Sequence, residues 1–233
     1  MNLRTIAGQI CRKLDVQASP RSALSERMKP PKLFPMFLKL STRPCLVVGA
    51  GTIAESKIAS LLETGARVRV VAPEATAQVR SWAASKNIEW HQRVFQPADL
   101  EGMLLVVAAT PSTELHELIY KEATQRGVLC NIVDVPSLCD FYYSSVVQRG
   151  ALQIAISTAG QSPALAQRLR KQLENQFGQE YEEWLAQLGE ARDKLRSANP
   201  DAEERKRLLH EDASEEAFEA FLRNRRQTKF PAK

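Results

Sequence analysis

The segment that most constrains the fold is an apolar run at residues 45–48, followed by two glycines and a helix-like sequence. Gly49 permits a tight turn, Gly51 lets the backbone approach a pyrophosphate, and the small Ala54 lets a helix pack close to the strand. The free N–H groups and positive dipole end of that helix would face the charge of the ligand. The pattern predicts a strand, a turn and a helix that bind a dinucleotide through Gly49, Ala50, Gly51, Thr52 and Ile53.

Short apolar runs and helix-like stretches alternate along the chain after this turn. The predicted strands are residues 45–48, 67–71, 88–95, 103–109 and 128–133, and the predicted helices are 53–63, 74–85 and 113–125. Strands that alternate with helices at this pitch form a parallel, doubly wound sheet. The fold class is therefore α/β with a Rossmann-like parallel sheet domain, which is the context that a dinucleotide turn requires.

The pattern changes after residue 140. Two strand-like runs, 141–147 and 152–157, have no helix between them and predict a β-hairpin outside the parallel sheet. Its exposed edges favour pairing with a second subunit, so we expect a homodimer. The remaining chain is helical. We predict a flexible leader (1–32), a dinucleotide-binding domain (33–140), a hairpin and dimerisation region (141–163) and a C-terminal helical domain (164–233).

The net charge of +5 comes from the leader and gives no evidence of a polyanionic partner. Residues 1–34 carry seven Lys or Arg and two Asp or Glu, which leaves 25 charges of each sign in the remainder. The folded part is close to neutral, so we expect no nucleic-acid partner. No apolar run is long enough to cross a membrane, and the four cysteines lack disulfide or zinc-site spacing. We therefore expect a cytoplasmic protein with no membrane contact and no metal site.

The end of the second strand bears on which dinucleotide binds. An acidic residue there usually holds the adenosine ribose, and here only Glu74 is available, directly after Pro73. No Arg follows immediately, so a 2′-phosphate would lack an obvious partner and NAD is favoured over NADP. Glu74 is equally well explained as a charge at a helix N-terminus. We assign both residues to the cofactor site.

The ends of the fourth and fifth strands reach the same rim of the predicted sheet. Ala109 and Thr110 lie where the nicotinamide ribose would pass, although Thr110 is equally suited to cap the next helix. At the end of the fifth strand, we assign Asn131 to the cofactor and Asp134 to catalysis. A partly desolvated Asp134 carboxylate would be a general base, and an Asp that only turns the chain is an equally good interpretation.

The hydroxyl-rich turn at residues 157–163 joins the hairpin to a helix. Ser162 is predicted as its N-cap and Pro163 as its first residue, which leaves Ser157 and Thr158 without a capping role. Such turns expose N–H groups that hold carboxylates. The predicted substrate-binding residues are Ser157, Thr158, Gly160, Ser162 and Arg149. Arg168 and Arg170 are further candidates that could equally be surface charges.

The three histidines, His91, His116 and His210, are scattered along the chain. We expect each on an ordinary strand or helix surface. No catalytic Ser-His-Asp or Cys-His set can be assembled from local spacing, so hydrolase chemistry is unsupported.

Taken together, these segments resemble the precorrin-2 dehydrogenase module of siroheme synthases, whose members can also be sirohydrochlorin ferrochelatases. The resemblance runs from Leu33 to about Leu195. It is carried by the glycine turn, by Cys130-Asn131-Ile132-Val133-Asp134, and by Ile156-Ser157-Thr158-Ala159-Gly160-Gln161-Ser162-Pro163-Ala164-Leu165-Ala166. The last two segments, in this order after a dinucleotide turn, are the specific part.

The resemblance implies NAD-dependent oxidation of precorrin-2 to sirohydrochlorin, in some members followed by insertion of ferrous iron. It also implies an intertwined homodimer whose hairpin and C-terminal helices build the substrate cleft. The family's catalytic Asp corresponds to Asp134, and its serine-rich loop corresponds to residues 157–162, with Thr158 where another Ser is common. Pro111 and Ser112 depart from the acidic residues frequent there. The alternative is a non-catalytic dinucleotide-sensing module, which has no need of Asp134.

Overall fold

The computed structural model describes residues 32–229, and the predicted leader lies outside this range apart from residue 32. Five strands form one parallel sheet in the order β3-β2-β1-β4-β5. Their bounds are β1 Pro44–Val48, β2 Arg67–Val71, β3 Ile88–His91, β4 Leu105–Ala108 and β5 Leu129–Ile132. The α/β fold class is confirmed. β3 ends four residues earlier than predicted because it pairs only with β2, whose last residue, Val71, is opposite His91.

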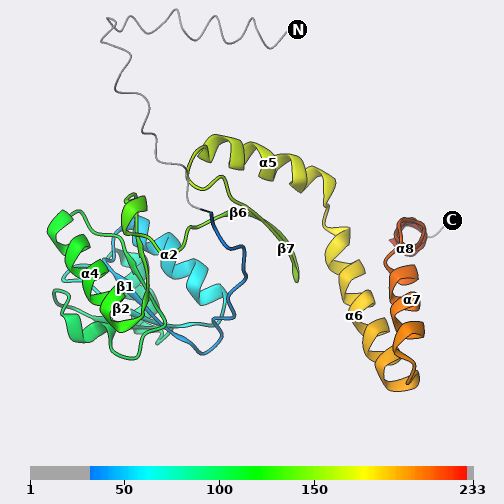
Figure 1. Cartoon of the computed structure of the whole chain (residues 1–233), viewed down its shortest axis with the longest axis horizontal. Helices are drawn as coiled ribbons and strands as arrows, with labels where there is room; N and C mark the ends of the chain where they lie inside the picture. Colours follow the sequence, from blue (N-terminus) through cyan, green and yellow to red (C-terminus); the bar gives the residue numbers. More distant parts are fainter. Residues whose placement is uncertain (1–31, 230–233) are drawn as a thin grey trace, which may run out of the picture. The chain divides into compact units, whose positions relative to one another are not determined.

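Helices cover both faces of the sheet. α2 (Thr52–Glu63) and α3 (Ala77–Ala84) pack on one face, and α4 (Thr113–Arg126) packs on the other (Figure 1). α3 starts three residues later than predicted, because the Thr76 side chain accepts a hydrogen bond from the N–H of Val79 and caps the helix there. Two short 3₁₀ helices, η2 (Pro97–Leu100) and η3 (Pro136–Leu138), complete this region.

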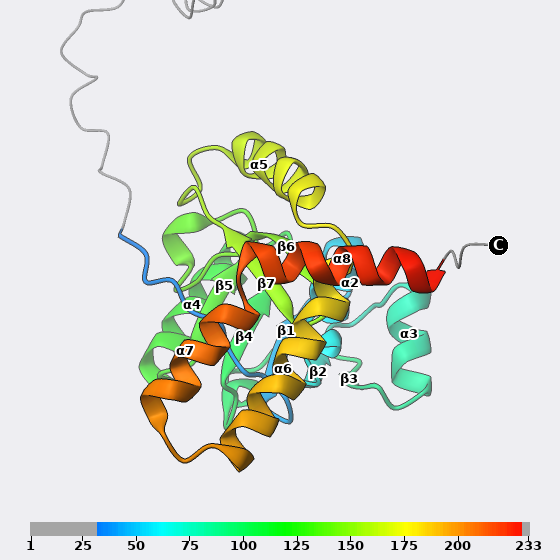
Figure 2. The same cartoon turned by 90° about the vertical axis from the view of Figure 1, so that its right-hand side faces the viewer.

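A separate antiparallel hairpin follows the sheet, as predicted. It consists of β6 (Ser145–Arg149) and β7 (Leu152–Ile156). β6 begins four residues later than predicted, since the carbonyl of Phe141 accepts a hydrogen bond from the Asn131 side chain of β5. The helices that follow are α5 Pro163–Gln176, α6 Glu180–Ala198, α7 Ala202–Asp212 and α8 Glu215–Lys229, and α6 contacts both α7 and α8 (Figure 2).

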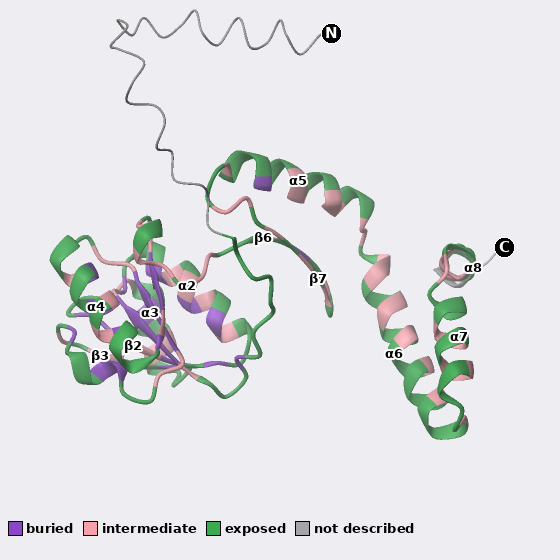
Figure 3. Ribbon diagram, viewed as in Figure 1, coloured by how far each residue is buried: buried purple, intermediate pink, exposed green. Residues whose placement is uncertain are grey.

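Burial is concentrated in the parallel sheet and its covering helices (Figure 3). Beyond residue 140, the described residues contribute only Val147 and Ala166 to the buried apolar set. α6 and α7 contain no buried residue at all. The predicted domain boundaries and the predicted homodimer stay predictions. No helix within residues 32–229 is long and apolar enough to span a membrane.

Candidate functional site

The turn between β1 and α2 contains two glycines with different structural needs. Gly49 has φ +103°, and a Cβ on it would lie 2.3 Å from the carbonyl oxygen of Ala109. Gly51 is the N-cap of α2, has φ −83°, and a Cβ on it would meet no described atom within 4 Å. Gly49 is therefore required by the packing of β1 against β4, whereas Gly51 keeps open space at a helix N-terminus. That space is where a phosphate would bind.

The other residues predicted at this turn surround the helix start. Ala50 is buried, and its carbonyl accepts a hydrogen bond from the N–H of Thr76 at 3.0 Å. Thr52 and the apolar Ile53 are exposed in the first turn of α2. Ala54 is fully buried against the sheet, as its small size predicted. The first turn of α2 thus presents free N–H groups and little covering side chain.

The segment after β2 places Pro73 and Glu74 in an exposed bend. The interpretation of Glu74 as a helix N-terminal charge is wrong, because α3 begins three residues later and has no acidic residue in its first turn. Arg80, on α3, donates a hydrogen bond to the carbonyl of Ala75. The structure therefore brings a guanidinium against the residue after Glu74, a contact that the sequence pattern did not predict.

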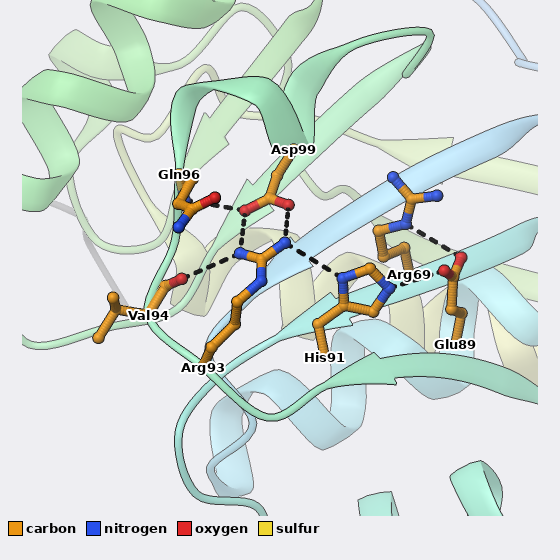
Figure 4. Close-up of polar contacts among 7 residues, drawn as sticks. All are labelled: Arg69, Glu89, His91, Arg93, Val94, Gln96 and Asp99. Carbon is orange, nitrogen blue, oxygen red and sulfur yellow. Dashed lines mark hydrogen bonds and ion pairs between the residues drawn. The ribbon is translucent and has the colours of Figure 1, made fainter.

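A network of charged side chains lies at the end of β3, the strand beside β2 (Figure 4). Both terminal nitrogens of Arg93 donate to the buried carboxylate of Asp99. Burial raises the pKa of the Asp99 carboxyl, but Arg93 and a backbone N–H lower that pKa by more, so the net shift is downward. His91 accepts from Arg93 through Nδ1, so its Nε2 carries the proton that faces Glu89. Arg93 is thus occupied by Asp99.

The segment after β4 contains a buried polar atom without a partner. The N–H of Ala109 donates to the carbonyl of Val48 at 2.9 Å, which fixes this segment over the glycine turn. Thr110 Oγ1 is buried and makes no hydrogen bond within the described chain. Thr110 is not the cap of α4, because Ser112 accepts the N–H of Leu115 there. A hydroxyl left free beside the glycine turn fits a dinucleotide that supplies its partner.

His116 is buried on α4, so the expectation that it lies on a helix surface is wrong. Its Nε2 lies 2.7 Å from the carbonyl oxygen of Thr110. A carbonyl only accepts hydrogen bonds, so Nε2 carries the proton. A sequence signal was present: His116, Ile119 and Ala123 follow helical spacing, and all three are buried. His116 holds the segment that carries the free hydroxyl.

Asn131 and Asp134 lie at the end of β5. Asn131 is buried, and its amide nitrogen donates to the carbonyl of Phe141 at 2.7 Å, so its observed contact is structural and its cofactor role stays a prediction. Asp134 is exposed and lies in a turn with φ +63°. The expected partial desolvation of Asp134 is therefore not found in the single chain. The preceding N–H, of Val133, donates to the carbonyl of Ala108, so Asp134 directly follows the rim shared with β4.

Lys57 on α2 was not singled out from the sequence. Its Nζ lies 3.8 Å from the centroid of the Tyr143 ring. Burial lowers the pKa of Lys57, and the charge of Asp134 partly opposes that effect by raising it. Lys57 lies three positions after the buried Ala54, and that helical spacing was the available signal.

The turn at residues 157–162 belongs to the connection between β7 and α5. Ser162 caps α5 by accepting the N–H of Leu165, and Pro163 is the first helical residue, as predicted. Ser157 and Thr158 each accept one backbone N–H inside the turn, and Gly160 has φ +78°. This turn forms no hydrogen bond with the rim of the sheet in the described part of the chain. Its substrate contacts stay a prediction.

Arg149 makes structural contacts at the end of α5. Its Nε donates to the carbonyl of Phe177 at 2.8 Å, and its Nη2 donates to the carbonyl of Glu174 at 3.0 Å. These bonds satisfy carbonyls that a helix C-terminus leaves free. Arg170 forms an ion pair with Glu174, and Arg168 is exposed. Binding of substrate by Arg149 stays a prediction, and its observed contacts stabilise α5.

Comparisons with known proteins agree with this geometry. Residues 36–145 match the NAD(P)-binding family, and residues 149–176 match the central domain of the sirohaem biosynthesis protein. The chain is 42% identical over 147 residues to a siroheme synthase of Nitrosococcus oceani, and 38% identical over 178 residues to one of Methylobacillus flagellatus. These matches cover 63% and 76% of this chain. They span 31% and 38% of the relatives, so the chain corresponds to about a third of their length.

A solved structure described as "SirC, precorrin-2 dehydrogenase" superposes with a TM-score of 0.68 at 28% identity. The superposition covers 82% of this chain and 98% of that structure. The order of the two matched families agrees with the order of the sheet and the hairpin. The glycine turn, the NAD(P)-binding match and this likeness establish a dinucleotide-binding domain. The chain belongs to the family of siroheme synthase N-terminal modules that includes the precorrin-2 dehydrogenases.

Proposed function

We propose that this chain is a precorrin-2 dehydrogenase of siroheme biosynthesis that uses NAD and forms sirohydrochlorin. The observation that carries the proposal is the meeting of three features at the carboxyl ends of β1, β4 and β5. These are the open helix N-terminus at Gly51, the free buried hydroxyl of Thr110, and the carboxylate of Asp134. Ligands of open α/β sheets bind at these strand ends.

The reaction needs one hydride acceptor and one base. Precorrin-2 loses a hydride and a proton as it becomes sirohydrochlorin, and the bound dinucleotide supplies the acceptor for the hydride. In this proposal Asp134 takes the proton, and its position directly after β5, on the rim where Thr110 lies, supports that role. The free N–H groups of α2 would hold the pyrophosphate and fix the distance between cofactor and substrate.

NAD is proposed over NADP from the charges near the end of β2. The exposed Glu74 carboxylate would bond to a ribose hydroxyl and would repel a 2′-phosphate. The Arg93 guanidinium is already paired with Asp99. Arg80 contacts the carbonyl of Ala75, next to Glu74, and would favour a phosphate. Titration of the protein with NAD⁺ and with NADP⁺ separates the two. We expect at least about tenfold tighter binding of NAD⁺, and equal affinities would contradict the role of Glu74.

Asp134→Asn tests the proposed base. Asn is the suitable replacement because, like Asp, it tolerates the left-handed backbone at φ +63°. We expect turnover of precorrin-2 to fall by about 100-fold or more while NAD binding stays within about twofold. Unchanged turnover would remove Asp134 from the mechanism. Absence of turnover in the parent protein, with NAD bound, would favour the dinucleotide-sensing module.

Two further measurements complete the test. Addition of ferrous iron to sirohydrochlorin in the presence of the protein tests whether iron insertion accompanies the dehydrogenase. Light scattering after size-exclusion chromatography tests the proposed homodimer, which would provide cover for the exposed hairpin strands.

A further inference from the structure

Lys57 carries a half-buried ammonium group that has no hydrogen-bond acceptor in the described part of the chain. Its Nζ lies over the Tyr143 ring at 3.8 Å from the centroid. Within residues 32–229 it makes no hydrogen bond and no ion pair closer than 4 Å. An ammonium has three donors, and a ring face satisfies none of them as an acceptor does. The group is therefore partly removed from water and still has its donors available.

The position of Lys57 connects three separate segments. It lies in the second turn of α2, Tyr143 precedes β6, and the charge of Asp134 after β5 acts on the Lys57 ammonium. Lys57 is six residues beyond the Gly51 N-cap, about 9 Å along a helix axis. That separation places it beyond the helix start where a pyrophosphate would bind, and on the side of the proposed base.

The surroundings of the Lys57 ammonium group favour an anionic ligand. A partly desolvated cation is unfavourable unless it gains hydrogen bonds from an acceptor, and charged acceptors give the strongest ones. A carboxylate-rich planar molecule that approaches Asp134 would offer such an acceptor.

We propose that Lys57 binds a carboxylate of the tetrapyrrole substrate at a position beside Asp134. This inference rests on the proposed function and adds a substrate contact to it. Tyr143 fixes the direction of the ammonium, so that the contact is made at one place on the substrate rim. Lys57 is a binding residue here, and Asp134 remains the proton acceptor.

The test replaces the charge while it keeps the length of the side chain. Lys57→Met removes the ammonium, Lys57→Arg retains a cation, and Lys121→Met, at an exposed position of α4, controls for loss of a surface charge. We expect Lys57→Met to raise KM for precorrin-2 at least about tenfold, with kcat within about threefold. Lys57→Arg should recover most of this loss. Lys121→Met should behave as the parent.

Binding measurements give a readout that does not depend on turnover. Titration with sirohydrochlorin should show the same loss of affinity in Lys57→Met and a weaker dependence on salt. NAD affinity should stay within about twofold of the parent. A fall in kcat at unchanged KM, a loss of NAD affinity, or an unchanged KM would each overturn the inference. A parent protein without any turnover or sirohydrochlorin binding would instead overturn the proposed function.

Discussion

The two glycines of the β1–α2 turn allow packing and ligand binding to be separated. In Gly49→Ala, the new Cβ would lie 2.3 Å from the carbonyl oxygen of Ala109, with the backbone at φ +103°. A non-glycine residue in such a conformation costs about 1–3 kcal/mol, and relief of the overlap costs about 1–3 kcal/mol more. The neighbouring strand cannot simply move away, because the N–H of Ala109 is bonded to Val48. We expect a loss of about 4 kcal/mol in the free energy of unfolding.

Gly51→Ala is the matched variant. Its φ of −83° suits alanine, and no described atom lies within 4 Å of the new Cβ. Alanine is a poorer N-cap than glycine, but it also restricts the unfolded chain, so we expect a net change within about 1 kcal/mol. The methyl group would occupy the space that the ligand needs. NAD affinity should therefore fall at least about tenfold in a fully folded protein.

Urea denaturation and calorimetric titration with NAD⁺ measure the two quantities on the same samples. Gly49→Ala should lose both stability and NAD binding, and Gly51→Ala should lose NAD binding alone. Parent-like NAD affinity in Gly51→Ala would show that the pyrophosphate does not lie at this helix. Parent-like stability in Gly49→Ala would show that β1 and β4 do not approach as closely as described.

Three further predictions concern buried groups. Asp99→Asn should lower the free energy of unfolding by about 2 kcal/mol at pH 7, because Arg93 loses an ionised acceptor. Hydrogen bonds lower the folded-state pKa of Asp99 despite burial, so its contribution is present above the unfolded value of 3.8 and is lost as pH falls below it. The two proteins should converge in urea titrations at low pH, and a constant difference would refute this. His116→Leu should weaken NAD binding about tenfold by releasing the carbonyl of Thr110, with partial recovery in His116→Gln; equal affinities by titration would exclude this positioning role. Burial raises the pKa of Cys130 to about 12, so native alkylation by iodoacetamide at pH 8 should be about 1000-fold slower than in denaturant, as mass spectrometry would show.

The sheet and its ligand edge could be predicted because both depend on local patterns. Apolar runs bounded by Gly and Pro mark buried parallel strands, and the carboxyl ends of such strands meet at one edge. Strand ends were less predictable, since partners decide them: the residues after His91 face no residue of β2. The helix start at Ala77 likewise depends on which hydroxyl caps it, and Thr76 does so instead of an earlier residue.

Side-chain surroundings were the least predictable part of the site. The free hydroxyl of Thr110 and the buried His116 that bonds to its carbonyl depend on how α4 is rotated against β4. The spacing of apolar residues predicts how α4 is rotated only when His116 is counted among the buried residues of that helix. The contact between Lys57 and Tyr143 joins positions 86 residues apart, and no local pattern describes it.

The exposure of Asp134 has a consequence for how the site works. A carboxylate in water is a weak general base, and it becomes more basic when its surroundings are desolvated. Among the described residues, Asp134 is exposed, and the only fully buried apolar residues after residue 140 are Val147 and Ala166. We expect the substrate, the dinucleotide or a second copy of the chain to cover Asp134 during the reaction. If this is correct, proton transfer should be coupled to ligand binding: the pH profiles of kcat and kcat/KM should differ, and coinciding profiles would contradict the coupling.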